Sequence, residues 1–215
     1  SDGSLTSATV SVSLTVNPVS SSLLFSDDFS RNSGDDPLAP WTLVSGTWNM
    51  VDGLLLGSGS SVSYSYLYAV PDAGWSDYVV EATLKFSSSA FGGGIGGRLD
   101  PATGTHYGAW IYPDNSIGGS NVLKLVKFRS WALWSGVPMQ QVSLGSVGTG
   151  WHTLKMVFNG SRIQVYYDGT LKIDVTDSGF DGRAPYSSGG ISADLWTYTS
   201  SFLMSLDQIS VSSLP

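Results

Sequence analysis

Apolar and polar side chains alternate most clearly along residues 151–175. Within this stretch, two runs carry an apolar side chain at every second position: Leu154, Met156 and Phe158, then Ile163, Val165 and Tyr167. An apolar period of two predicts β-strands with one buried face. The dipeptides Asn159-Gly160 and Asp168-Gly169 separate the runs, and both favour the positive φ angles of a tight hairpin turn. The pattern predicts a meander of three antiparallel strands.

The same alternation continues along most of the chain. We expect strands near residues 23–29, 41–44, 47–51, 54–57, 62–69, 78–87, 93–99, 105–112, 122–129, 141–145, 151–158, 161–167, 170–175, 189–196 and 201–211. No segment keeps the 3.6-residue apolar period of an amphipathic helix over three turns. Many short strands separated by turn residues are typical of a sandwich or jelly roll. The prediction is an all-β chain folded as a two-sheet antiparallel β-sandwich.

The first 19 residues stand apart from the main domain, which we expect over residues 23–212. Val or Leu occupies every second position from Val10 to Val16, and Pro18 ends this run, so one strand is predicted here. A lone strand cannot form a domain. Residues 1–19 are therefore expected either to be a loose terminal segment or linker, or to pair with the edge of a neighbouring domain or chain.

Composition narrows the classes of partner. The 215 residues suit one large sandwich, and they carry a net charge of −7 with only 13% charged residues. No basic cluster is present, which argues against nucleic acid and anionic membrane surfaces. No run of 18 apolar residues occurs, so membrane insertion is not expected. Cysteine is absent, which excludes disulfides and thiolate metal sites.

Several segments together resemble one domain family. They are FSDDFS (Phe25–Ser30), GTWNMVDGLLLG (Gly46–Gly57), DYVVEATLKF (Asp77–Phe86), IGGRL with HYGAWIY (Ile95–Leu99 and His106–Tyr112), and FLMSLDQISV (Phe202–Val211). In this order and spacing they resemble secreted laminin-G-like domains, which have the concanavalin A-like jelly-roll fold. Residues 1–19 resemble the last strand of a bacterial immunoglobulin-like repeat. The resemblance implies a glycan-binding domain excised from a larger secreted or cell-surface protein.

Calcium is the cofactor that the resemblance implies. Related domains hold a structural calcium ion where the first and last strands meet, and here Asp28 and Asp207 are the leading ligands, with Asp27 third. Calcium prefers six to eight oxygen ligands, so carbonyl oxygens would have to complete the site. The alternative is that Asp28 caps a turn and Asp207 binds backbone amides. The loop from Asp177 to Gly182 is a weaker candidate, because it lacks the closing Glu of an EF-hand.

Aromatic residues in polar loops are the candidates for ligand contact. Trp131 and Trp134 lie in one predicted loop, and Trp196 and Tyr198 lie in another. Sugars stack their C–H faces on aromatic rings and need polar partners for their hydroxyls, for which Arg98 or an Asp is the candidate. The alternative is that some of these rings plug the ends of the sandwich, as we expect of Trp41, Trp48 and Trp151.

Catalytic chemistry is poorly supported by the sequence. Glycoside hydrolysis usually needs two carboxylates, and the only Glu, Glu81, has no partner at the spacing that hydrolases of this fold use. A serine triad lacks its Gly-x-Ser-x-Gly elbow. Arg98, His106 and Tyr107 are the residue types of a polysaccharide lyase. However, His106 and Tyr107 are adjacent, so on a strand they point to opposite faces.

These observations predict a non-catalytic carbohydrate-binding module of a secreted multidomain protein, with a structural calcium ion and a polysaccharide or glycan as partner. The alternative is a surface adhesin or assembly module in which residues 1–19 pair with a neighbouring chain. A groove lined with aromatic residues would favour the first function, and a strand docked outside the sandwich would favour the second.

Overall fold

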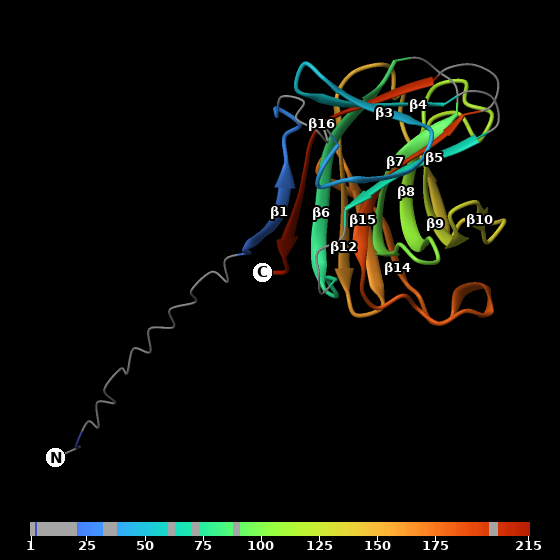
Figure 1. Cartoon of the computed structure of the whole chain (residues 1–215). Helices are drawn as coiled ribbons and strands as arrows, with labels where there is room; N and C mark the ends of the chain where they lie inside the picture. The colour runs from blue at the N-terminus through green and yellow to red at the C-terminus, as the bar shows by residue number, and fades with distance from the viewer. Residues whose placement is uncertain are drawn as a thin grey trace.

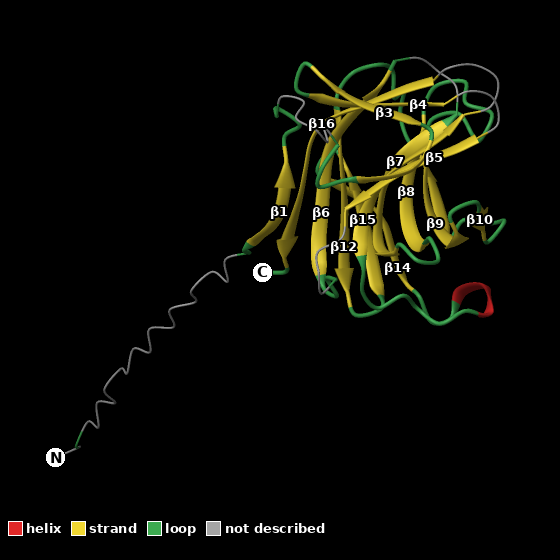
Figure 2. Ribbon diagram, in the orientation of Figure 1, coloured by secondary structure: helices red, strands yellow, loops and turns green. Residues whose placement is uncertain are grey.

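The computed structural model describes Gly3 and residues 21–31, 38–59, 63–69, 74–87, 91–197 and 202–215. Two antiparallel sheets face each other in this part of the chain, and Figure 2 shows strands almost throughout, with a single helical turn. That turn is the 3₁₀-helix η1 (Phe180–Gly182). The described residues include no helix that is long and apolar enough to cross a membrane. The strand predicted over residues 10–16 lies outside the described residues.

Each sheet contains eight strands in the described part of the chain (Figure 1). Sheet A consists, in spatial order, of β14 (Thr170–Thr176), β13 (Arg162–Tyr167), β12 (His152–Asn159), β6 (Tyr78–Phe86), β16 (Phe202–Ser213), β4 (Leu54–Gly59) and β3 (Thr47–Val51), with β1 (Leu23–Asp27) also paired to β16. Sheet B consists of β10 (Leu133–Trp134), β9 (Val122–Ser130), β8 (Thr105–Tyr112), β7 (Gly92–Asp100), β15 (Gly190–Thr197), β5 (Ser63–Ala69) and β2 (Thr42–Ser45), with β11 (Gln140–Ser143) also paired to β9. The predicted all-β sandwich is confirmed.

The predicted meander β12–β13–β14 is present, but one of its two turns differs by a residue. Between β13 and β14, Asp168 and Gly169 both have positive φ, as predicted. Between β12 and β13, Asn159 pairs with Arg162, so the two turn residues are Gly160 and Ser161 rather than Asn159 and Gly160. Gly160 has a φ of 54°, which glycine adopts without a steric penalty.

Alternate residues of each strand point into the core between the sheets. In β6 the buried positions Val80, Ala82, Leu84 and Phe86 alternate with more exposed ones. This alternation gives the period of two seen in the sequence. Trp41 and Trp48 belong to the core, as predicted. The same expectation is wrong for Trp151, which is 42% exposed and has the Lys85 ammonium 4.4 Å from its ring centre.

The first and last strands of the domain are neighbours, as predicted. β1 runs antiparallel to the end of β16, with Asp27 opposite Ile209, and Figure 1 shows the two strands side by side. The pairing brings the two ends of the domain to one edge of sheet A.

Strands at the centre of sheet B are buried on both faces. From Gly92 to Leu99 every residue of β7 is buried, and β8 and β15 are nearly as enclosed. One face of these strands packs against the core. The other face is covered by a separate cluster of aromatic side chains.

Candidate functional site

The face of sheet B that points away from the core is aromatic, and we call it the aromatic face. Its buried members are Tyr66, Trp110, Tyr112, Val126 and Phe128, and the partly buried residues packed against them are Tyr64, Val122, Trp131, Trp134 and Trp196. They come from β5, β8, β9, β10 and β15 and from the loop before β10. Residues two apart on a strand share a face, so Tyr64 and Tyr66 lie together, as do Trp110 and Tyr112.

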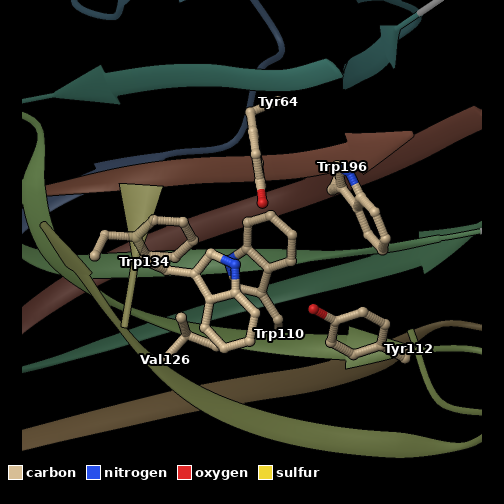
Figure 3. A pocket seen from close by; sticks show the side chains of 7 residues that line it. Tyr64, Trp110, Tyr112, Val126, Trp134 and Trp196 are labelled. Carbon is tan, nitrogen blue, oxygen red and sulfur yellow. The ribbon is translucent and has the colours of Figure 1, made fainter. Parts of the chain in front are cut away.

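A pocket of about 100 Å³ opens within the aromatic face (Figure 3). It is lined by Tyr64, Trp110, Tyr112, Val126, Phe128, Trp134 and Trp196. Three of the lining residues, Tyr64, Trp134 and Trp196, are only half-buried, so their rings are available to a ligand. The hydroxyl oxygens of Tyr64 and Tyr112 point toward the interior of the pocket (Figure 3).

Both pocket hydroxyls are neutral hydrogen-bonding groups. Burial raises the pKa of Tyr64 and of Tyr112 above the ordinary tyrosine value, and the pKa of Tyr112 is raised further by the nearby Tyr64. Each therefore keeps its proton at neutral pH and is able to donate one hydrogen bond. The Trp134 side chain lies near the Tyr64 hydroxyl and opposes this rise in the pKa of Tyr64. The pocket thus has uncharged walls with two hydroxyl donors.

A buried carboxylate lies beneath the aromatic side chains. Asp194 of β15 is fully buried, and its Oδ2 accepts a hydrogen bond from Trp110 Nε1 at 3.0 Å and lies 3.2 Å from His106 Nε2. His106 Nδ1 lies 2.8 Å from the carbonyl oxygen of Gly104. A carbonyl oxygen can only accept a hydrogen bond, so His106 Nδ1–H donates to Gly104 and Nε2 faces the Asp194 carboxylate. This pair fixes the position of the Trp110 indole.

Of the pocket residues predicted from sequence, Trp134 and Trp196 line the pocket. Trp134 is positioned by β10, a short strand in a segment that the sequence predicted to be a loop. Trp131 lies beside the pocket rather than in it, because its ring packs 5.2 Å from Tyr66 and 5.7 Å from Tyr68. Tyr198 lies outside the described residues.

Arg98 was predicted as a polar partner for a ligand, and the structure places it elsewhere. Its φ is 52°, and its side chain is only 1% exposed. The guanidinium donates hydrogen bonds to the carbonyl oxygens of Ser76 and Tyr186 and to the carboxylate of Asp77. These acceptors satisfy the buried cation, so Arg98 holds loops together at one end of the sandwich.

His106 and Tyr107 point to opposite sides of β8, as predicted. The imidazole of His106 stacks on Phe128 of the aromatic face at 4.3 Å. Tyr107 points into the core, where its hydroxyl donates to Asp177 at 2.6 Å. The two side chains therefore cannot act on one substrate as the acid and base of a lyase.

Asp27 does not fit the predicted calcium site. Its carboxylate accepts hydrogen bonds from the backbone N–H of Phe29 at 2.8 Å, from Trp41 Nε1 at 2.7 Å and from the Arg31 guanidinium at 2.5 Å. These donors occupy both carboxylate oxygens, and the Arg31 charge repels a second cation. Asp27 is therefore an anchor for the segment that follows β1.

Asp28 and Asp207 remain as calcium candidates. Asp28 accepts hydrogen bonds from the backbone N–H and the hydroxyl of Ser30, which lower its pKa, and it therefore makes the turn contact that the sequence offered as the alternative. Asp207 is exposed at a bulge in β16. The next residue, Gln208, lines a shallow hollow together with Asp28. No group of three or more His, Asp or Glu side chains converges within the described ranges. Calcium at this junction stays a prediction.

The second calcium candidate, the loop that begins at Asp177, holds a lysine instead. Lys127 Nζ donates to Asp177 Oδ2 at 2.7 Å and to the carbonyl oxygens of Arg183 and Ala184 at 2.9 and 3.0 Å. Burial alone would raise the pKa of Asp177, but the hydrogen bonds from Lys127 and Tyr107 outweigh it and lower this pKa. The ammonium takes the position that a metal ion would need, so the residues of this loop do not fit calcium.

Several residues of the site were not predicted from sequence. They are Tyr64, Trp110, Tyr112, Val126, Phe128 and Asp194. β7, β8 and β15 are buried almost throughout, and strands buried on both faces carry apolar residues at successive positions. Such an apolar run is the sequence signal that could have identified these residues. In GAWIY (Gly108–Tyr112), for instance, the core takes Ala109 and Ile111, and the aromatic face takes Trp110 and Tyr112.

The structure is similar to several proteins that act on or bind carbohydrate. No protein-family model matches the chain, and no curated protein matches its sequence. The carbohydrate-binding module CBM66 from Bacillus subtilis aligns with a TM-score of 0.61 and 21% identity, over 77% of this chain and 91% of that one. The laminarinase catalytic domain from Thermotoga maritima aligns with a TM-score of 0.65 and 9% identity, over 91% and 99% of the two chains. The fold is a concanavalin A-like jelly roll.

A third structure of this fold is the Bacillus licheniformis β-glucanase, with a TM-score of 0.63 and 14% identity over 93% of this chain and 100% of that one. The fold is thus shared by a non-catalytic binding module and by glucanases. All three identities are below 25%, so the likeness shows the fold alone. Function has to be inferred from the residues of the site.

Proposed function

We propose that this domain is a non-catalytic carbohydrate-binding module that holds a polysaccharide or other glycan on the aromatic face of sheet B. The observation that carries the proposal is the pocket bordered by the half-buried rings of Tyr64, Trp134 and Trp196. Such rings offer flat apolar surfaces to the C–H faces of a sugar, and the Tyr64 and Tyr112 hydroxyls offer hydrogen bonds. The same fold occurs in a carbohydrate-binding module.

The described residues of this face include no carboxylate pair, which supports a binding role rather than hydrolysis. Asp194 is the acidic side chain among the buried residues of the described aromatic face, and it is hydrogen-bonded to Trp110 and His106. Hydrolysis by the common mechanism needs two carboxylates that both reach the sugar. Asp194 is instead fully buried and hydrogen-bonded to Trp110, so its role is to position Trp110.

We propose a secreted or cell-surface parent protein and a structural calcium ion held between Asp28 and Asp207 at the junction of β1 and β16. The low charge and the absence of a basic cluster fit a neutral glycan better than nucleic acid or a membrane. Pairing by residues 1–19 stays the alternative, since that segment, apart from Gly3, lies outside the described residues.

A glycan array tests the proposal with three tryptophan variants. We expect the parent chain to bind, and Trp134→Ala and Trp196→Ala each to weaken binding at least about tenfold, because a stacking ring at a hot spot contributes on the order of 2 kcal/mol. Trp151→Ala is the matched control: its ring is 42% exposed just before β12 of sheet A.

The fold of each variant is checked by its melting curve, so that lost binding is not confused with unfolding. Equal binding by the parent and both pocket variants would place the ligand elsewhere. If the parent bound no glycan on a broad array, carbohydrate binding itself would be contradicted.

A further inference from the structure

The pocket is too small for a sugar ring and large enough for a substituent on one. Its volume is about 100 Å³. A cavity of roughly 150 Å³ is what binds one benzene molecule in an engineered protein core. A pyranose ring with its hydroxyls is bulkier than benzene. The ring of a bound sugar would therefore lie outside, against the half-buried rings at the border, and only a group of a few heavy atoms would enter.

The polar atoms of the pocket favour one kind of substituent. The indole N–H of Trp110 already donates to Asp194, and the Trp134 side chain lies near the Tyr64 hydroxyl. Val126 and Phe128 contribute only carbon to the lining. The hydroxyl hydrogens of Tyr64 and Tyr112 have no hydrogen-bonded acceptor among the described residues, so both can donate to a ligand. A substituent that fits the pocket therefore has an apolar end and one hydrogen-bond acceptor.

We propose that the pocket receives the acetyl group of an acetylated sugar. This proposal rests on the glycan-binding function proposed above and names the ligand class of the same site. The acetyl methyl packs against Val126 and Phe128, and the acetyl carbonyl oxygen accepts a hydrogen bond from the Tyr112 or Tyr64 hydroxyl. An acetyl group has three heavy atoms, carries no charge and has an acceptor but no donor on its carbonyl, so it matches both the volume and the donors.

A sugar that has a bare hydroxyl in place of the acetyl group is a poorer ligand for two reasons. It leaves the apolar part of the pocket without a partner, and loss of a single methylene-sized group from an apolar pocket costs about tenfold or more in discrimination. A buried tyrosine hydroxyl also loses its acceptor, which adds to the cost. Acetylated glycans should therefore bind at least about tenfold more tightly than their non-acetylated counterparts.

Matched glycan pairs test the acetyl preference by isothermal titration calorimetry on the full chain. Chito- and cello-oligosaccharides share a backbone and differ in the N-acetyl group. Acetylated xylan, before and after alkaline deacetylation, provides the O-acetyl pair. The same comparison is made for every array glycan that binds. Loss of affinity of about tenfold or more on removing the acetyl group supports the proposal, and the two pairs show whether N-acetyl or O-acetyl sugars are the source.

Two variants locate the preference in the pocket. Tyr112→Phe removes one hydroxyl donor, and Val126→Ile narrows the pocket, so each is expected to reduce the advantage of acetylated over non-acetylated glycan. Tyr166→Phe on β13 of sheet A is the matched control, and it should leave both affinities unchanged. Melting curves confirm that the variants fold.

The acetyl assignment and the glycan-binding function fail on different results. Glycan binding that does not change when the acetyl groups are removed overturns the acetyl assignment and leaves the glycan-binding function standing. An acetyl preference that survives undiminished in both Tyr112→Phe and Val126→Ile also overturns it, because the group then binds elsewhere. If no glycan of either kind binds the parent chain, the proposed function itself fails.

Discussion

At the scale of single residues, several side chains with apparent functional chemistry hold the fold together. Arg98 satisfies backbone carbonyl oxygens, Asp27 collects three donors, and Lys127 forms a buried pair with Asp177. A charged group inside a protein must find partners of opposite charge or hydrogen-bonding atoms, because the cost of leaving it unpaired is high. These three buried charges each hold a loop or a strand end in place.

The Lys127–Asp177 pair yields a prediction on stability. Lys127→Met should lower the free energy of unfolding by about 3–5 kcal/mol, since it leaves the Asp177 carboxylate and two carbonyl oxygens buried without their cation. Urea denaturation measures the change. Arg162→Met is the control: its pair with Asp174 is exposed, and such pairs contribute at most about 1 kcal/mol. Equal losses in both variants would contradict the structural role given to Lys127.

At the scale of elements, the glycine-rich strand β7 makes room for the site. A Cβ atom on Gly96 would lie 2.2 Å from Ser192 Oγ and 2.9 Å from the His106 ring. Glycine at this position lets the buried His106–Asp194 pair and the aromatic side chains above it approach the sheet closely. Because its glycines have no side chains, β7 leaves space that the side chains of neighbouring strands fill.

Gly96→Ala tests this role of β7. The added methyl group must displace Ser192 or His106, and overpacking of this kind costs roughly 1–3 kcal/mol. We expect a lower melting temperature and, because Asp194 and Trp110 move with His106, weaker glycan binding. Gly145→Ala is the control, since its added Cβ would meet nothing within 4 Å. A Gly96→Ala chain as stable as the parent would contradict the close packing of Ser192 and His106 against Gly96.

At the scale of the whole molecule, the two ends of the domain meet in the pairing of β1 with β16. A cation bound there would link the first and last strands and so oppose separation of the chain ends. Two exposed carboxylates are only part of the six to eight oxygens that calcium prefers, so carbonyl oxygens or water must supply the others.

Calcium removal tests the proposed junction ion. EDTA should lower the melting temperature of the parent chain, because a ligand that binds only the folded state stabilises it by mass action. The double variant Asp28→Asn and Asp207→Asn should melt at the same temperature with and without EDTA. Asp174→Asn, on β14 of sheet A, should keep the parent's response. An unchanged parent melting curve, together with metal analysis that finds no calcium, would contradict the proposed calcium ion.

The residue pattern alone predicts the fold class and most strand positions, and the family resemblance adds the meeting of the first and last strands. The reason is that strands with one exposed face, such as β6 and β12, show their alternation directly in the order of residues. Turn residues also carry local information, since Gly160 and Gly169 need positive φ, although the first turn lies one residue later than Asn159-Gly160 suggests.

Strand pairing and packing determine which residues form the pocket. The centre of sheet B is covered on both faces, so almost every position of β7 and β8 is buried and the alternation that assigns a residue to one face disappears. Trp134 and Trp196 could be predicted as ligand contacts because they are aromatic residues in polar stretches of the sequence. Tyr64, Trp110 and Tyr112 join them only through strand pairing, and Arg98 and Asp27 are removed from the candidate ligands only by the partners that folding brings to them.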